Sequence, residues 1–182
     1  MSYLNTKERY GSLSIALHWV MFLLMAAVFA CVEFHENFPK GDPMRSLLMV
    51  WHFQLGIAVL ILVCVRLIAK VMAPEPEIKP VLTRVQYLGA KAMHLALYLV
   101  MVGMPIAGYI GRTLAGKTTY FFGIALPVFL QTNKDLAENI FDIHSLIGNT
   151  AYFLIGAHAL AALYHHYIQK DNTLTRMLPA RK

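Results

Sequence analysis

The sequence predicts an all-α membrane protein, a bundle of four transmembrane helices that forms one domain over residues 1–182. Of the 182 residues, 58% are hydrophobic and only 14% are charged, whereas a soluble domain carries about a quarter charged residues. Four hydrophobic blocks of about 19–25 residues are each long enough to cross a hydrocarbon core of roughly 30 Å: Leu13–Val32, Leu47–Ala69, Ala92–Ile110 and Ile143–Tyr167. None alternates with the two-residue period of a barrel strand, so helices must satisfy the backbone.

The helices are expected at about 13–34, 47–70, 91–111 and 142–168. Short, turn-forming residues separate the first two, and a proline-rich stretch, "APEPEIKPVLTRVQ", follows the second. The longest loop, between the third and fourth helices, contains "YFFGIALPVFL". This run is too short to cross the membrane. We expect it to lie in the outer interface or to fold back over the bundle as a lid.

The positions of the charges predict how the chain sits in the membrane. Eleven Lys and Arg residues lie in the N-terminal segment, the second loop and the tail, against five in the first and third loops. Because positive residues are enriched on the cytoplasmic side, both termini are predicted to be cytoplasmic. The net charge of +6 therefore indicates topology and not a nucleic-acid partner.

Histidines within the hydrophobic blocks point to a cofactor. His144 and His158 are fourteen residues apart, which places them on one helix face and about 21 Å apart along the axis. Depth in the membrane pairs His52 with His144 near the outside, and His158 with either His18 or His94 near the inside. Six-coordinate haem takes one imidazole from each side of its plane. Zinc is disfavoured because no cysteine or carboxylate joins either pair.

The sequence therefore predicts two b haems stacked across the bilayer. Gly56 follows His52 by four residues and Gly148 follows His144 by four, so each glycine leaves room for a flat macrocycle on its histidine's face. Small residues on a membrane helix also serve plain helix packing. The chain has no C-x-x-C-H motif, which excludes covalent attachment of a c-type haem.

Three further residues have two or more possible roles. Arg66, fourteen residues after His52, pairs with a propionate of the inner haem or extends to water as an ordinary anchor. His165, seven residues after His158, donates to a quinone carbonyl or is simply interfacial. His94 is a structural hydrogen-bonding residue, a propionate contact, or an axial ligand in place of His18.

Several segments resemble the bacterial cytochrome b561 family over essentially the whole chain. The resemblance is carried by "IALHW", "WHFQLG", "HLALYLVMVGMPIAGY", "HSLIGNTAYFLIGAHALAALYHHY" and "KDNTLTRMLP". It implies a bacterial inner-membrane protein with two haem b groups. It also implies that His18, and not His94, is the partner of His158, and that His52 is the partner of His144.

The family includes a superoxide oxidase, so the resemblance implies superoxide:ubiquinone oxidoreductase activity, with ubiquinone as electron acceptor. The outer loops do not show the positive charge that would attract an anion. Three basic and three acidic residues balance in the third loop and its edges: Arg112, Lys117, Lys134, Asp135, Glu138 and Asp142. The alternative is a cytochrome b subunit that relays electrons between a docked dehydrogenase, or a soluble periplasmic carrier, and quinone.

Overall fold

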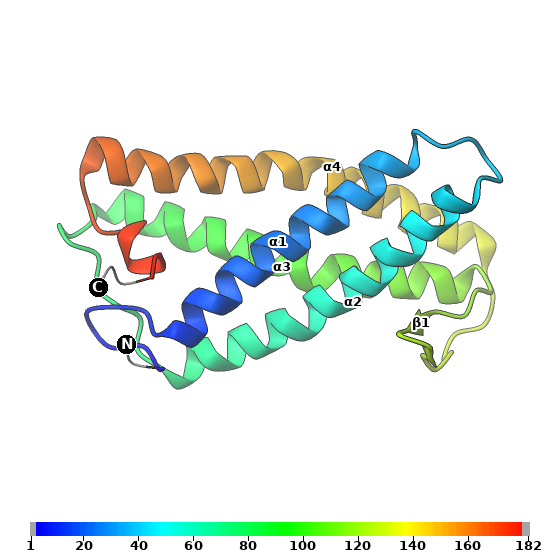
Figure 1. The fold of residues 1–182 in the computed structure, drawn as a ribbon, viewed down its shortest axis with the longest axis horizontal. Helices are drawn as coiled ribbons and strands as arrows, with labels where there is room; N and C mark the ends of the chain where they lie inside the picture. Colours follow the sequence, from blue (N-terminus) through cyan, green and yellow to red (C-terminus); the bar gives the residue numbers. More distant parts are fainter. Residues whose placement is uncertain (1–2, 180–182) are drawn as a thin grey trace.

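Four long helices make up most of the structure, a computed structural model that describes residues 3–179 (Figure 1). They are α1 (Ser12–His35), α2 (Pro43–Met72), α3 (Arg84–Leu114) and α4 (Lys134–Tyr164). Each is long and apolar enough to cross a membrane. The predicted fold class, an all-α bundle of four membrane-spanning helices, is confirmed.

Three of the helices begin before the hydrophobic blocks do, because polar residues cap them. The Asp42 side chain accepts a hydrogen bond from the backbone N–H of Met44 at the start of α2. Thr83 and Gln86 form a reciprocal capping box at the start of α3, and Asn133 caps α4. Such caps satisfy the free N–H groups of a first turn, so the helices extend past the apolar residues that predicted them.

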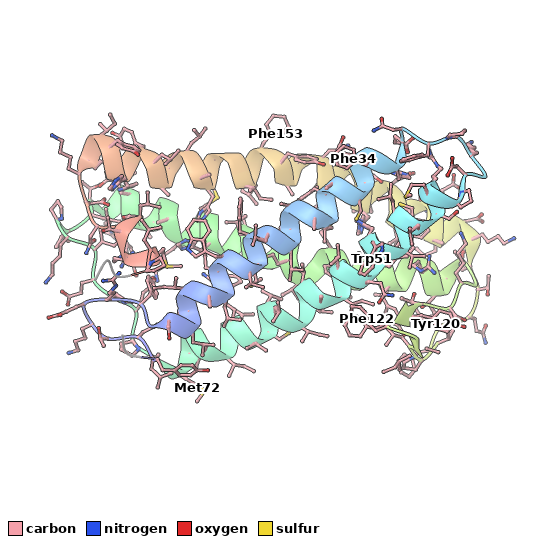
Figure 2. The ribbon with its side chains drawn as sticks, viewed as in Figure 1. Phe34, Trp51, Met72, Tyr120, Phe122 and Phe153 are labelled. Carbon is pink, nitrogen blue, oxygen red and sulfur yellow. The ribbon has the colours of Figure 1, made fainter. Side chains whose placement is uncertain are left out.

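The helices pack as two pairs, α1 with α2 and α3 with α4, and α2 also lies against α3. Val59 and Val63 of α2 are the largest fully buried side chains among the described residues. Many large apolar side chains face outward instead; Phe153, on the outside of α4, is 81% exposed (Figure 2). An outward apolar surface is stable in lipid, which agrees with a membrane bundle.

The loop between α3 and α4 folds back against α2 at one end of the bundle. Its short hairpin consists of β1 (Tyr120–Phe121) and β2 (Ile124–Ala125). At the hairpin turn the backbone N–H of Phe122 donates to Gln54 Oε1 of α2 at 2.7 Å, and the Phe122 ring lies beside Trp51 (Figure 2). The loop thus folds back as far as α2, and most of its large apolar side chains are exposed.

The segment after α4 returns over the opposite end of the bundle (Figure 1). Regular α-helix ends at Tyr164, and a π-helical turn, η1 (His165–Gln169), and a 3₁₀ turn, η2 (Thr175–Met177), follow. Lys170 reverses the chain between them with a φ of 55°. We call residues 165–179 the C-terminal cap, because they close this end of the bundle beside residues 3–11.

Candidate functional site

An outer histidine pair joins α2 to α4 at the loop end of the bundle. The ring centroids of His52 and His144 are 6.2 Å apart, and both residues are half-buried. His52 Nδ1 lies 3.2 Å from the carbonyl oxygen of Val28 on α1, which fixes Nδ1 as the donor and leaves Nε2 free. A histidine that binds a metal uses its second nitrogen in this way.

Glycines shape the cavity beside the outer pair. Gly56, Gly108 and both histidines line it. A Cβ at Gly108 would lie 3.3 Å from His144 Cε1, so the ring rests directly on the α3 backbone. A Cβ at Gly56 would meet nothing within 4 Å, so this glycine borders open space, as expected for a residue beside a flat ligand.

An inner histidine cluster lies at the cap end. The His158 ring of α4 has its centroid 6.4 Å from that of His18 on α1 and 5.6 Å from that of His94 on α3. His18 Nδ1 is buried and has no hydrogen-bond partner among residues 3–179. Both residues that the sequence offered as partners of His158 are therefore adjacent to it.

The spacing of the rings fits a metal held between two imidazoles. With a metal–nitrogen distance of about 2 Å on each side, and each ring centroid roughly 1 Å behind its nitrogen, the centroids lie about 6 Å apart. The outer pair, at 6.2 Å, is close to this spacing, and so are both inner pairs, His18–His158 at 6.4 Å and His94–His158 at 5.6 Å. His144 Nδ1, like that of His18, is buried and unpaired within the described chain. The outer pair, and His158 with either His18 or His94, can hold haem iron.

Arg66 extends from α2 toward the inner cluster. Its Nε lies 3.3 Å from the Tyr98 hydroxyl of α3, and its Nη1 lies 3.4 Å from the carbonyl oxygen of Ser14, four residues before His18. The guanidinium thus bridges α1 and α3 next to the inner histidines. The predicted propionate contact remains a prediction, and the position of Arg66 is compatible with it.

His165 belongs to the C-terminal cap. Its Nδ1 lies 2.5 Å from Asp171 Oδ2, and the Asp171 side chain is 2% exposed. Burial opposes ionisation of this carboxyl, but hydrogen bonds from the Thr173 backbone N–H and from His165 outweigh it and lower the pKa of Asp171 below its usual value. Only the Nε2 atom of His165 is therefore left for a further hydrogen bond.

The sequence analysis did not identify two features of the site. Arg112 lines the outer cavity, although it entered the sequence analysis only as a loop charge. Its position four residues after Gly108, hence on the same face of one helix, was the available signal. At the other end, Arg176 is 8% exposed, lies over the Tyr10 ring and donates to the Pro76 carbonyl oxygen. No local sequence pattern predicts a contact between residues that are a hundred positions apart.

Four membrane-length helices with a histidine pair toward each end define a membrane electron-transfer protein of the cytochrome type. The family model of prokaryotic cytochrome b561 matches residues 9–180. The chain therefore belongs to the prokaryotic cytochrome b561 family, as the sequence resemblance predicted, and membership implies haem b as cofactor.

Curated relatives match the chain along nearly its full length. Cytochrome b561 homolog 1 of Escherichia coli K12 is 40% identical over 175 residues, which cover 96% of this chain and 99% of the relative. A probable superoxide oxidase, CybB, of Yersinia pestis is 35% identical over 176 residues, 96% of this chain and 98% of the relative. Cytochrome b561 homolog 2 of Escherichia coli K12 is 32% identical over 98% of this chain and 95% of its own length.

Proposed function

We propose that the protein binds two b haems and transfers electrons across the bacterial inner membrane, oxidising superoxide at its outer, periplasmic end and reducing ubiquinone. The observation that carries the proposal is the placement of the His52–His144 pair and the His158 cluster toward opposite ends of one membrane bundle. Bound haem b supplies a one-electron carrier at each end.

Each part of the chain has a defined task in this proposal. His52 and His144 are the axial ligands of the outer haem, and the Val28 carbonyl oxygen fixes the orientation of the His52 ring. His158 and His18 are the ligands of the inner haem, and Arg66 holds one of its propionates. His165 Nε2 donates to a carbonyl oxygen of the quinone, while Asp171 keeps the ring in place through Nδ1. His94, whose ring centroid lies 5.6 Å from that of His158, packs against this ligand and supports its position.

Two observations support the proposed direction of electron transfer and the proposed substrate. The eleven-to-five distribution of basic residues supports a cytoplasmic C-terminal cap and a periplasmic α3–α4 loop. The Yersinia pestis relative, named as a probable superoxide oxidase, aligns with 96% of this chain. An outer site exposed to the periplasm meets superoxide formed there, which does not cross a membrane readily because it is an anion.

The test is the visible spectrum of the purified, oxidised protein during a pulse of superoxide, with and without added ubiquinone. We expect reduced b-haem bands within the pulse and their discharge when quinone is present. A His144→Ala variant should lose the response to superoxide, whereas His35→Ala, a change to an outer histidine outside the pair, should keep it. Protein that binds no haem during expression with excess haem would refute the proposal.

A second function, a cytochrome subunit that exchanges electrons with a docked protein, is favoured by the α3–α4 loop. Several of its large apolar residues are exposed, namely Tyr120, Phe122, Ile124, Val128 and Phe129, and an exposed apolar group of this kind marks an interaction surface. Haem bands that dithionite reduces but superoxide leaves unchanged would favour this second function.

A further inference from the structure

Arg112 is held rigidly at the edge of the outer cavity. It stands in the last turn of α3 and lines the same cavity as His52 and His144. Its Nε donates to Thr119 Oγ1 at 3.1 Å and its Nη2 to the Thr118 carbonyl oxygen at 3.0 Å. Its Cζ lies 4.0 Å from the centroid of the Phe53 ring.

These contacts leave one end of the guanidinium available. Within residues 3–179, no hydrogen bond uses Nη1 and no carboxylate forms an ion pair with Arg112. The balancing acidic residues of the loop therefore do not neutralise it. A half-buried charge without a counter-charge is costly, and arginine is the side chain best suited to bind anionic oxygens through its fork of donors.

We propose that Arg112 is the anion-binding residue of the outer cavity and that its Nη1 end binds an anionic oxygen group beside the His52–His144 pair. This group is either a carboxylate of the cofactor held by that pair or a small oxyanion substrate such as superoxide. The inference rests on the proposed function and assigns to one residue the positive charge that the loop as a whole lacks.

The position of the α3–α4 loop is part of this site. Thr119 is 4% exposed, and together with Thr118 it fixes the orientation of the guanidinium. Because Thr118 and Thr119 directly precede the β1–β2 hairpin, the contacts of the hairpin with α2 also restrain Arg112. The loop thus positions the anion site as well as packing against α2.

The test compares Arg112→Gln and Arg112→Lys with Lys117→Gln, which removes an exposed cation from the same loop. Haem content is measured first, and a potentiometric titration of the outer haem follows in the absence of superoxide. A nearby cation favours the reduced form, which carries one positive charge less. If the anion is a cofactor carboxylate, Arg112→Gln should lower the equilibrium constant for reduction about tenfold, which is about 59 mV for one electron. Arg112→Lys should change it less.

The kinetic measurement identifies the other source of the anion. If the ligand is a free oxyanion, Arg112→Gln also removes a cation near the haem, so the potential again falls and the rate must separate the two cases. In this case Arg112→Gln should reduce the rate of haem reduction by superoxide at low salt about tenfold and weaken its dependence on ionic strength, whereas a cofactor carboxylate predicts a lower potential with an unchanged salt dependence. The inference is overturned if Arg112→Gln and Lys117→Gln agree in both potential and rate. Wild-type protein without haem would instead overturn the proposed function, before any variant is compared.

Discussion

Gly108→Ala tests whether the α3 backbone sets the position of the His144 ring. The added Cβ would lie 3.3 Å from His144 Cε1, whereas carbon atoms in good contact are about 3.5–4.0 Å apart. The ring must therefore move by about 0.2–0.7 Å, or α3 and α4 must separate by that amount. Under the proposed function His144 is a ligand of the outer haem, so its displacement should weaken the binding of that haem and leave the inner one unaffected.

We expect Gly108→Ala to lower the affinity for the outer haem about tenfold. Changes to residues that support a metal ligand lower metal affinity about 10- to 100-fold, so this is the small end of that range. This corresponds to about 1.4 kcal/mol. The assay is the rate at which a haem-free acceptor protein removes each haem from the purified cytochrome, followed in the visible spectrum. Only the outer component should accelerate.

Gly103→Ala is the matched control on the same helix. A Cβ at Gly103 would meet nothing within 4 Å, so the ring of His144 is not disturbed. Both variants remove a glycine from a helix interior, which favours the helix by roughly 0.5–1 kcal/mol, so neither should lower the melting temperature through the helix itself. Equal rates of haem loss in the two variants would show that Gly108 does not position His144.

Three other predictions concern the cap end. His18→Ala should abolish the absorbance of the inner haem and keep that of the outer one, whereas His94→Ala should keep both; the reverse result would make His94 the ligand. Arg66→Gln should lower the potential of the inner haem in the same redox titration, and an unchanged value would exclude a propionate contact. Because folding lowers the pKa of Asp171, its ionised carboxylate stabilises the folded C-terminal cap. This contribution to stability should be complete above the ordinary carboxyl pKa of about 4 and decline as the pH falls below it. The protection factors of the cap amides in hydrogen exchange should therefore be high at pH 5–8 and fall toward pH 3, and those of Asp171→Asn should be low throughout.

The four helices could be predicted because each one follows from the residues of its own segment. Each span is a continuous apolar block, and the membrane thickness sets its length. The first turns of α2, α3 and α4 could not be located in this way, because Asp42, Thr83 and Asn133 cap them outside the apolar blocks. In the sequence, each of these helix starts is marked only by one polar residue, of a type that is also common in loops.

The site was predictable where helix periodicity alone relates its residues. Fourteen residues separate His144 from His158 on one face, and depth alone then placed His52 beside His144, as the structure does. The contacts of Arg112 with Thr119, and of His165 with Asp171, depend on how the chain reverses after α3 and α4. Such reversals follow from tertiary packing and not from the spacing of residues.

The C-terminal cap also sets an order for assembly of the protein. Trp19, next to His18, donates to the Met177 carbonyl oxygen, and Arg9 donates to that of Leu178, so the start of α1 is completed by residues made after all four helices. Since synthesis proceeds from the N-terminus, this end of the bundle stays open until the cap has been made. Under the proposed function, this opening gives the inner haem a route to His158 before the cap closes.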